Sequence, residues 1–311
     1  MKESDARSSS SLRASVPADV ILPALPYHLQ RIHEVEVSAP DFLAIGHLTI
    51  DLIGRRRQLG GAALYAALGA SRLGVQTALV TTASPAELML LDTFPVAVAS
   101  QPAAQTTTFR SAYQKEKRRQ KLLARATPIA SANIPTDWIS SKIVYLAPVV
   151  AEIEPELLGL FPDSMRGVGI QGWLRSWDTH GNVCRTPLPR DGAELDTAAV
   201  AFLSAEDVDD RIDLIARYAS HSPCLVVTRA AEGADMYCGG QRHTSPAYAA
   251  NPVDPTGAGD VFAAAFLVRL SQGADPAATA RFANCAASFA VEQHGLDGVP
   301  TLDQIQFRLQ E

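Results

Sequence analysis

The chain has 311 residues, of which 47% are hydrophobic, and this size suits one large α/β domain or one domain with a small appendage. Its formal net charge of −6 at pH 7 argues against duplex nucleic acid as the main partner. No apolar run approaches the roughly 20 residues that a membrane-spanning helix needs, so the sequence gives no sign of a membrane partner.

The first 38 residues differ in composition from the rest. The stretch "MKESDARSSSSLRASVPADV" is rich in serine, alanine and charge, without a sustained apolar period. It lacks the apolar core of a secretory signal, and its acidic residues fit poorly with a transit peptide. We therefore predict a disordered N-terminal extension over residues 1–38, with a regulatory arm as the alternative, and a folded domain over 39–311.

Short apolar runs alternate with helix-like segments along the rest of the chain. The helical spacing appears in residues 60–74, 152–161 and 205–220. The apolar runs are typical of strands buried on both faces, and they cover residues 42–46, 77–82, 143–147, 168–170, 200–204 and 225–228. Strands that alternate with helices predict a doubly wound parallel sheet, which binds ligands beyond the carboxyl ends of its strands.

Two segments, residues 49–61 and 106–129, do not fit this alternation. Both look like extended pieces with polar turns, and the second has strand-like flanks around a charged turn at 115–121. We interpret them as a small β flap over the ligand crevice. Their basic runs are either solvated hairpin tips or an electropositive rim that attracts a polyphosphate. His47, after the first strand, either contacts substrate or packs in the core.

The four cysteines, Cys184, Cys224, Cys238 and Cys285, are scattered and form no CxxC pair. This spacing does not suggest a zinc site or a disulfide framework. We predict four reduced thiols in a cytoplasmic protein.

The stretch "NPVDPTGAGDVFAAAFLVRL", residues 251–270, places the acidic Asp260 between a Gly-Ala-Gly turn and an apolar run. The run is apolar nearly all round, so it predicts a buried helix. A helix N-terminus presents free N–H groups and a partial positive charge, and the small residues Gly257, Ala258 and Gly259 would let a phosphate approach them. Asp260 is then either a helix-capping carboxylate or a base that accepts the proton of an attacking hydroxyl.

The stretch "DPTGAGDVFAAAF" closely resembles the C-terminal signature of the PfkB, or ribokinase-like, family of carbohydrate and nucleoside kinases. Four further stretches resemble other signatures of the family in the same order: "FLAIGHLTID", "LGGAALYAALGASRLG", "VVTRAAEGA" and "RFANCAASFAV". The resemblance spans roughly residues 41 to 305. It implies a ribokinase-like α/β fold, with a doubly wound, mostly parallel sheet, helices on both faces and a small β lid.

The resemblance also implies a role for each matching position. Asp260 matches the catalytic base, and Gly257, Ala258 and Gly259 match the anion hole. The positions that match the acceptor site are Asp51, Gly60, Gly61, Tyr65 and Arg175. The positions that match the nucleotide site are Thr228, Glu232, Gly233, Asp254, Thr256, Gly257, Gly259 and Asn284. ATP is then the co-substrate and Mg²⁺ the cofactor.

Three departures from the family pattern stand out. The metal-linked Asn-x-x-Glu appears here as "SAED", in which Ser204 and Asp207 are expected to hold metal-bound waters. Ala230 stands where a glycine is usual. Tyr65 replaces the asparagine that commonly binds sugar hydroxyls, which argues against ribokinase and fructokinase.

One subgroup fits better. The stretches "GGAALYAA", "TTTFRSAY" and "GIQGWLRSWDTHGNV" resemble those of myo-inositol kinases. We therefore predict an ATP-dependent kinase of a small polyhydroxy substrate, such as myo-inositol, that acts as a monomer or homodimer. The alternatives are a sugar or nucleoside kinase of the same family, and a catalytically silent sensor that binds nucleotide or sugar.

Overall fold

The computed structural model describes residues 38–114 and 117–310. Residues 37–311 form one compact unit by themselves. The extension predicted over residues 1–38 lies almost wholly outside the described residues, so its disorder stays a prediction. Among the described residues, no helix combines the length and apolar character that crossing a membrane requires.

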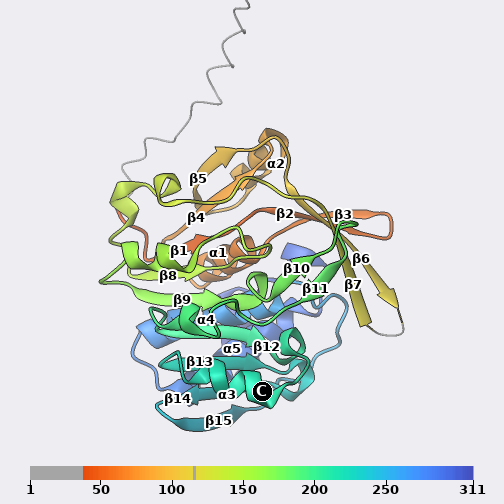
Figure 1. Cartoon of the computed structure of the whole chain (residues 1–311). Helices are drawn as coiled ribbons and strands as arrows, with labels where there is room; N and C mark the ends of the chain where they lie inside the picture. Colours follow the sequence, from red (N-terminus) through yellow and green to blue (C-terminus); the bar gives the residue numbers. More distant parts are fainter. Residues whose placement is uncertain (1–37, 115–116, 311) are drawn as a thin grey trace, which may run out of the picture. The chain divides into compact units, whose positions relative to one another are not determined.

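A nine-stranded sheet forms the centre of this unit (Figure 1). All its pairings are parallel except β13–β14 and β14–β15, so the prediction of a mostly parallel sheet is confirmed. In spatial order the strands are β15 (Gln241–Ser245), β14 (Ala234–Cys238), β13 (Cys224–Thr228), β12 (Val200–Ser204), β9 (Met165–Gly169), β8 (Ile143–Leu146), β1 (Phe42–Ile45), β4 (Thr77–Ala83) and β5 (Ala97–Pro102).

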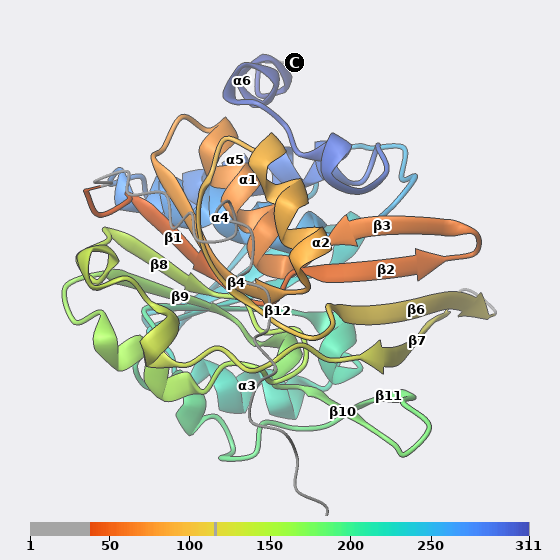
Figure 2. The same cartoon turned by 90° about the horizontal axis from the view of Figure 1, so that it is seen from above.

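Helices cover both faces of the sheet (Figure 2). On one face α1 (Ala62–Arg72) and α5 (Pro276–Ala290) flank α4 (Ala258–Ser271), and on the other lies α3 (Ile212–Ala219). Successive residues of β1 point into opposite cores, with Phe42 and Ala44 in one and Leu43 and Ile45 in the other. This is the pattern that runs apolar on both faces predict. The short helices α2 (Pro85–Leu88) and α6 (Leu302–Arg308) complete the unit.

Two of the predicted helices differ in the structure. Within 152–161 the structure forms only a 3₁₀ helix, Pro155–Leu160. Within 205–220 a 3₁₀ turn, Ala205–Val208, is separated from α3 by Asp209 and Asp210, both with positive φ (51° and 54°). Aspartate tolerates this left-handed conformation better than most residues, and the helix is interrupted there.

A second sheet of four strands, ordered β3-β2-β6-β7, extends from the central sheet (Figure 2). It consists of β2 (Thr49–Ile53), β3 (Arg56–Gly60), β6 (Thr107–Gln114) and β7 (Lys117–Ala124). These strands lie in the two segments predicted as a β flap, 49–61 and 106–129. The hairpin β10 (Arg175–Trp177) and β11 (Val183–Arg185) adjoins it, where the Leu122 amide donates to the Gly181 carbonyl at 2.8 Å.

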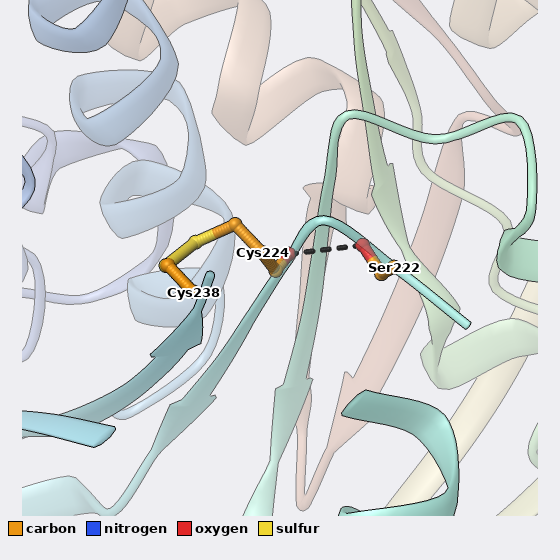
Figure 3. Close-up of a disulfide and its surroundings, with 3 residues drawn as sticks. All are labelled: Ser222, Cys224 and Cys238. Carbon is orange, nitrogen blue, oxygen red and sulfur yellow. Dashed lines mark hydrogen bonds between the residues drawn. A yellow bond between two sulfur atoms is a disulfide. The ribbon is translucent and has the colours of Figure 1, made fainter. Parts of the chain in front are cut away.

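Cys224 and Cys238 form a disulfide, with Cα atoms 4.1 Å apart (Figure 3). The two residues are direct partners on the neighbouring antiparallel strands β13 and β14. The prediction of four reduced thiols is therefore wrong for this pair. The sequence did not show the pairing because β14 was not predicted. Cys184, which is exposed, and Cys285, which is buried, are not part of this disulfide.

Candidate active site

The turn at residues 257–260 joins a loop to helix α4. Gly257 is the N-cap of α4 and has a φ of 82°, a left-handed conformation that favours glycine. A Cβ atom on Gly257 would also overlap the ring of Tyr65, so a side chain is excluded for two reasons. A Cβ on Gly259 would meet no atom within 4 Å, which shows open space beside the first helical turn. This open helix N-terminus suits an anion.

Asp260 lies in the first turn of α4, at the edge of this space. Burial of the carboxyl raises its pKa to about 7. The positive charge of Arg175 opposes this rise, the negative charge of Asp207 adds to it, and a hydrogen bond from Tyr145 opposes it. A carboxyl that titrates near neutral pH is suited to accept and release a proton.

Tyr145, in β8, is buried with its hydroxyl directed at Asp260. Burial, and then the Asp260 charge, raise the pKa of the Tyr145 hydroxyl well above its usual value, so it stays protonated and can donate. A Cβ atom on Gly169, in β9, would overlap that hydroxyl. The glycine in the neighbouring strand therefore provides the space for this contact, which no sequence pattern predicted.

Arg175 is the first residue of β10. Its Nη1 donates to the Val149 carbonyl at 3.3 Å, and its guanidinium lies 5.8 Å from the centre of the Phe109 ring in β6. Its charge acts on Asp260. The structure therefore brings the predicted arginine and the predicted base together, although 85 residues separate them in the sequence.

The Val149 carbonyl, which accepts from Arg175, lies in a turn whose amides are bound by Glu152. Glu152 is 1% exposed. Its carboxylate accepts from the amides of His47 (3.1 Å), Val149 (2.9 Å) and Val150 (2.8 Å). The ring of His47 is fully buried, with Nε2 2.8 Å from the Thr127 carbonyl and Nδ1 2.8 Å from the Thr107 hydroxyl. Burial lowers the pKa of His47. Of its two possible roles, His47 has the packing role in this structure.

The predicted acceptor residues lie where β2 and β3 meet α1. Asp51 is 5% exposed and pairs directly with Gln58 of β3. A Cβ on Gly60 would lie 3.2 Å from the Asp51 carboxylate, so glycine keeps the approach to this carboxylate open. Gly61 has a φ of 118° as the N-cap of α1, and a Cβ there would overlap the His47 carbonyl.

Tyr65 is 1% exposed, and its ring packs against Gly257. Its hydroxyl accepts from Gln58 Nε2 at 3.3 Å. Burial raises the pKa of Tyr65, so the phenol stays neutral. Tyr65, predicted to belong to the acceptor site, is therefore covered in this structure, with its ring against the 257–260 turn.

The predicted nucleotide turn follows β13. Thr228 ends this strand, and Glu232 is exposed on the turn. Gly233 has a φ of 98°, and a Cβ there would overlap the Ser245 carbonyl. Ala230 has a φ of 47°, which is strained for a residue with a side chain. Ala230 stands where the family usually has glycine, and the backbone conformation at this position favours glycine.

Two other predicted nucleotide residues support loops. Asn284 is 6% exposed, and its Nδ2 donates to the Ser245 carbonyl (3.1 Å), the Ser245 hydroxyl (3.0 Å) and the Pro246 carbonyl (3.1 Å). Asp254 accepts from the amides of Thr256 (3.0 Å) and Gly295 (3.3 Å). Burial works against ionisation of Asp254, yet these hydrogen bonds keep its pKa below the usual value.

A surface pocket of about 310 Å³ adjoins Asn284, because Ser245 and Pro246 line it. Tyr248 and Arg281 form its polar side, where Arg281 Nε donates to the Tyr248 hydroxyl at 2.9 Å.

The predicted metal residues lie at the end of β12 and in the turn after it. Asp207 accepts from the Ser204 amide at 3.1 Å and from Gln171 Nε2 at 3.2 Å, and Ser204 caps the 3₁₀ turn. Asp207 raises the pKa of Asp260, so the two carboxylates repel each other electrostatically. A divalent cation between them would offset this repulsion. No group of three or more His, Cys, Asp or Glu that could hold a metal ion occurs among the described residues.

A family model described as "pfkB family carbohydrate kinase" matches residues 193–302. The chain is 41% identical over 83 residues to a ribokinase of Bacillus subtilis (26% of this chain, 28% of that protein). It is 29% identical over 178 residues to an inositol 3-kinase of Arabidopsis thaliana (56% and 50%). The matches thus span only about a quarter to half of these two relatives.

Solved structures match over more of the chain. A pyrophosphate-dependent kinase of the ribokinase family, complexed with a pyrophosphate analogue and myo-inositol, has a TM-score of 0.72 at 20% identity (86% of this chain, 99% of that chain). Ribokinase of Arabidopsis thaliana, complexed with ribose and ATP, has a TM-score of 0.69 at 18% identity (88% and 99%). These likenesses show that the chain has the ribokinase-family fold, and the match to the PfkB family model covers residues 193–302 of it.

Proposed function

We propose that this protein is a kinase that transfers a phosphoryl group to a hydroxyl of a small polyhydroxy compound, with a cyclitol such as myo-inositol as the best candidate. The observation that supports the proposal most is Asp260, a carboxyl in the first turn of α4 whose pKa is raised to about 7 by burial. A base next to an anion site is what transfer of a phosphoryl group to an alcohol requires.

In the proposed reaction, the Asp260 carboxylate accepts the proton of the acceptor hydroxyl. The hydroxyl oxygen then forms a bond to the terminal phosphorus of the donor, and the bond from that phosphorus to the leaving oxygen breaks. Amides of the first turn of α4 stabilise the charge that builds up on the phosphoryl oxygens. Arg175, whose charge acts on Asp260, adds positive charge on the same side.

Asp207 and Ser204 would hold Mg²⁺ through water ligands. Oδ1 of Asp207 accepts from Gln171 and Oδ2 from the Ser204 amide, and a carboxylate with two such bonds keeps lone pairs for a hydrated cation. When bound, Mg²⁺ would neutralise donor phosphate charge. Few protein ligands are needed, because Mg²⁺ commonly keeps several waters and binds phosphates directly.

The acceptor assignment rests on Asp51 and on the relatives. Asp51 is a buried carboxylate at the junction of β2 and β3, and it would accept hydrogen bonds from vicinal hydroxyls. The Arabidopsis inositol 3-kinase and the structure complexed with myo-inositol favour a cyclitol. A sugar or nucleoside acceptor is the second candidate, favoured by a cytidine kinase of Thermococcus kodakarensis that is 26% identical over 75% of this chain.

ATP is the proposed donor. The pocket of about 310 Å³ lined by Tyr248 and Arg281 would take the base, and the nearby turn with Thr228 and Gly233 would hold the phosphates. Pyrophosphate is the second candidate donor, since the structure with a pyrophosphate analogue has the higher of the two TM-scores. A cytoplasmic location and a monomeric or homodimeric state stay predictions.

The test is a kinetic comparison of acceptors, each with saturating ATP or pyrophosphate in the presence of Mg²⁺. We expect myo-inositol or a close cyclitol to have a higher kcat/KM than ribose, fructose, adenosine or cytidine. If ribose or a nucleoside exceeded the cyclitol by tenfold, the cyclitol proposal would be wrong and the kinase proposal would stand. Absence of turnover with every pair would instead favour a silent sensor.

A further inference from the structure

Gln58 connects the acceptor side of the site to the phosphate side. It lies in β3, directly opposite Asp51 of β2. Directly opposed residues of an antiparallel pair project from the same face of a sheet, so Gln58 and Asp51 share a face. Gln58 therefore belongs to the strand pair that carries the proposed acceptor carboxylate.

The Gln58 amide reaches two residues that lie far away in the sequence. Nε2 is 3.3 Å from the Tyr65 hydroxyl and 3.4 Å from Asp254 Oδ2, and both oxygens accept from it. Gly295 leaves room for this arrangement, because a Cβ there would lie only 2.7 Å from Gln58 Nε2. The Gly295 amide donates to the same Asp254 oxygen at 3.3 Å.

Both partners of Gln58 support the turn at 257–260. The Tyr65 ring packs directly against Gly257, whose left-handed conformation begins helix α4. Asp254 accepts from the Thr256 amide and so fixes the loop that leads into Gly257. Gln58 is thus linked to the turn in two ways: through the Tyr65 ring that packs against Gly257, and through Asp254 in the preceding loop.

We propose that Gln58 is a positioning residue that sets the anion hole at 257–259 relative to Asp260 and the acceptor strands. This inference rests on the proposed function. Gln58 touches neither the donor nor the acceptor in this role, and it acts through Tyr65 and Asp254. Because a displacement of about 1 Å in a reacting group can lower a rate by about 100-fold, losing this link affects turnover more than acceptor binding.

The test compares Gln58→Met with Gln120→Met. Methionine removes the amide at similar volume. Gln120 lies in β7 of the same four-stranded sheet and donates to the Ser111 hydroxyl at 3.4 Å, away from Tyr65 and Asp254, so it is a matched control. For Gln58→Met we expect kcat to fall about 10- to 100-fold, with the acceptor KM within about threefold of the wild type. Gln120→Met should retain the wild-type kcat.

A second measurement does not depend on turnover. Calorimetric titration with inorganic pyrophosphate, as a probe anion, should show weaker binding to Gln58→Met than to the wild type and to Gln120→Met. If the wild type phosphorylates no acceptor but this difference holds, the proposed function fails and the role of Gln58 at the anion site stands. A wild type that binds neither pyrophosphate nor ATP would overturn both.

Tyr65→Phe keeps the proposal testable if Gln58→Met does not fold, since it removes only the hydroxyl that accepts from Gln58. We expect a smaller loss of kcat in Tyr65→Phe, and a loss in the double variant smaller than the product of the single losses. A kcat within twofold of the wild type in Gln58→Met, or equal losses in Gln58→Met and Gln120→Met, would overturn the proposal. If Gln58→Met does not fold, a Tyr65→Phe variant with unchanged kcat and unchanged pyrophosphate affinity would overturn the proposal.

Discussion

The sequence left Asp260 as either a helix cap or a base. In the structure the N-cap of α4 is Gly257, without a side-chain cap hydrogen bond, and the role of Asp260 as base stays a proposal. Asp260 lies in the first turn of a helix, where a carboxylate is favoured by the helix dipole, and burial nevertheless raises its pKa to about 7. Asp260→Asn keeps the shape and removes the proton acceptor. We expect kcat to fall about 10²–10⁴-fold with donor affinity little changed. Turnover above half of the wild-type value would show that Asp260 is not the base.

The same raised pKa makes stability depend on pH. Because the folded pKa of Asp260 (about 7) lies above the ordinary value of 3.8, its contribution is fully present below pH 3.8 and is lost as pH rises through 7. A difference of about three pKa units corresponds to roughly 4 kcal/mol as an upper bound. Asp260→Asn should therefore be more stable than the wild type at pH 8 in urea unfolding. The difference in unfolding free energy between the variant and the wild type should become smaller toward pH 5. An equal difference at both pH values would contradict the claim that burial raises the Asp260 pKa.

Tyr145 should tune the activity of Asp260. Its hydrogen bond favours the Asp260 carboxylate, so Tyr145→Phe should raise the Asp260 pKa. The acidic limb of the kcat/KM profile, which we expect near pH 7 in the wild type, should then move to higher pH. Tyr218→Phe is a control, because that buried tyrosine hydroxyl accepts from the Leu188 amide at 3.1 Å, in the core on the other face of the sheet. A profile of Tyr145→Phe that matched the wild type would exclude this tuning.

At the scale of elements, short sequence patterns predicted the strands and helices whose formation depends on neighbouring residues. The six apolar runs became β1, β4, β8, β9, β12 and β13, and the GAGD stretch became the start of α4. The role of Glu152 was not predicted, because its segment was interpreted as a helix. In the structure Glu152 accepts hydrogen bonds from the amides of Val149 and Val150, and Arg175 donates to the Val149 carbonyl. Gln58 was missed because its partner Asp254 is 196 residues away, and no short pattern encodes such a contact.

The disulfide between β13 and β14 belongs to this scale as well. Its cysteines are 14 residues apart, and closing a loop of about this length stabilises a fold by up to about 3 kcal/mol in the chain-entropy model. Cys224 begins β13, whereas Thr228 of the proposed nucleotide turn ends it. Cys224→Ser should therefore lower the melting temperature and leave kcat nearly unchanged. Alkylation with mass spectrometry checks the bond, and four alkylated cysteines without reductant would contradict it.

At the scale of the whole molecule, the candidate site gathers residues from distant parts of one unit, residues 37–311. Both large hydrophobic cores of the described residues draw their members from between Phe42 and Leu309. Removing residues 1–36 therefore takes away none of these core side chains. We expect the truncated protein to keep the melting temperature within a few degrees and kcat within about twofold of the full chain. A much lower melting temperature would show that residues 1–36 pack on the domain. A changed kcat at the same melting temperature would instead support the alternative of a regulatory arm, because the catalytic groups would then respond to a segment that the fold does not need.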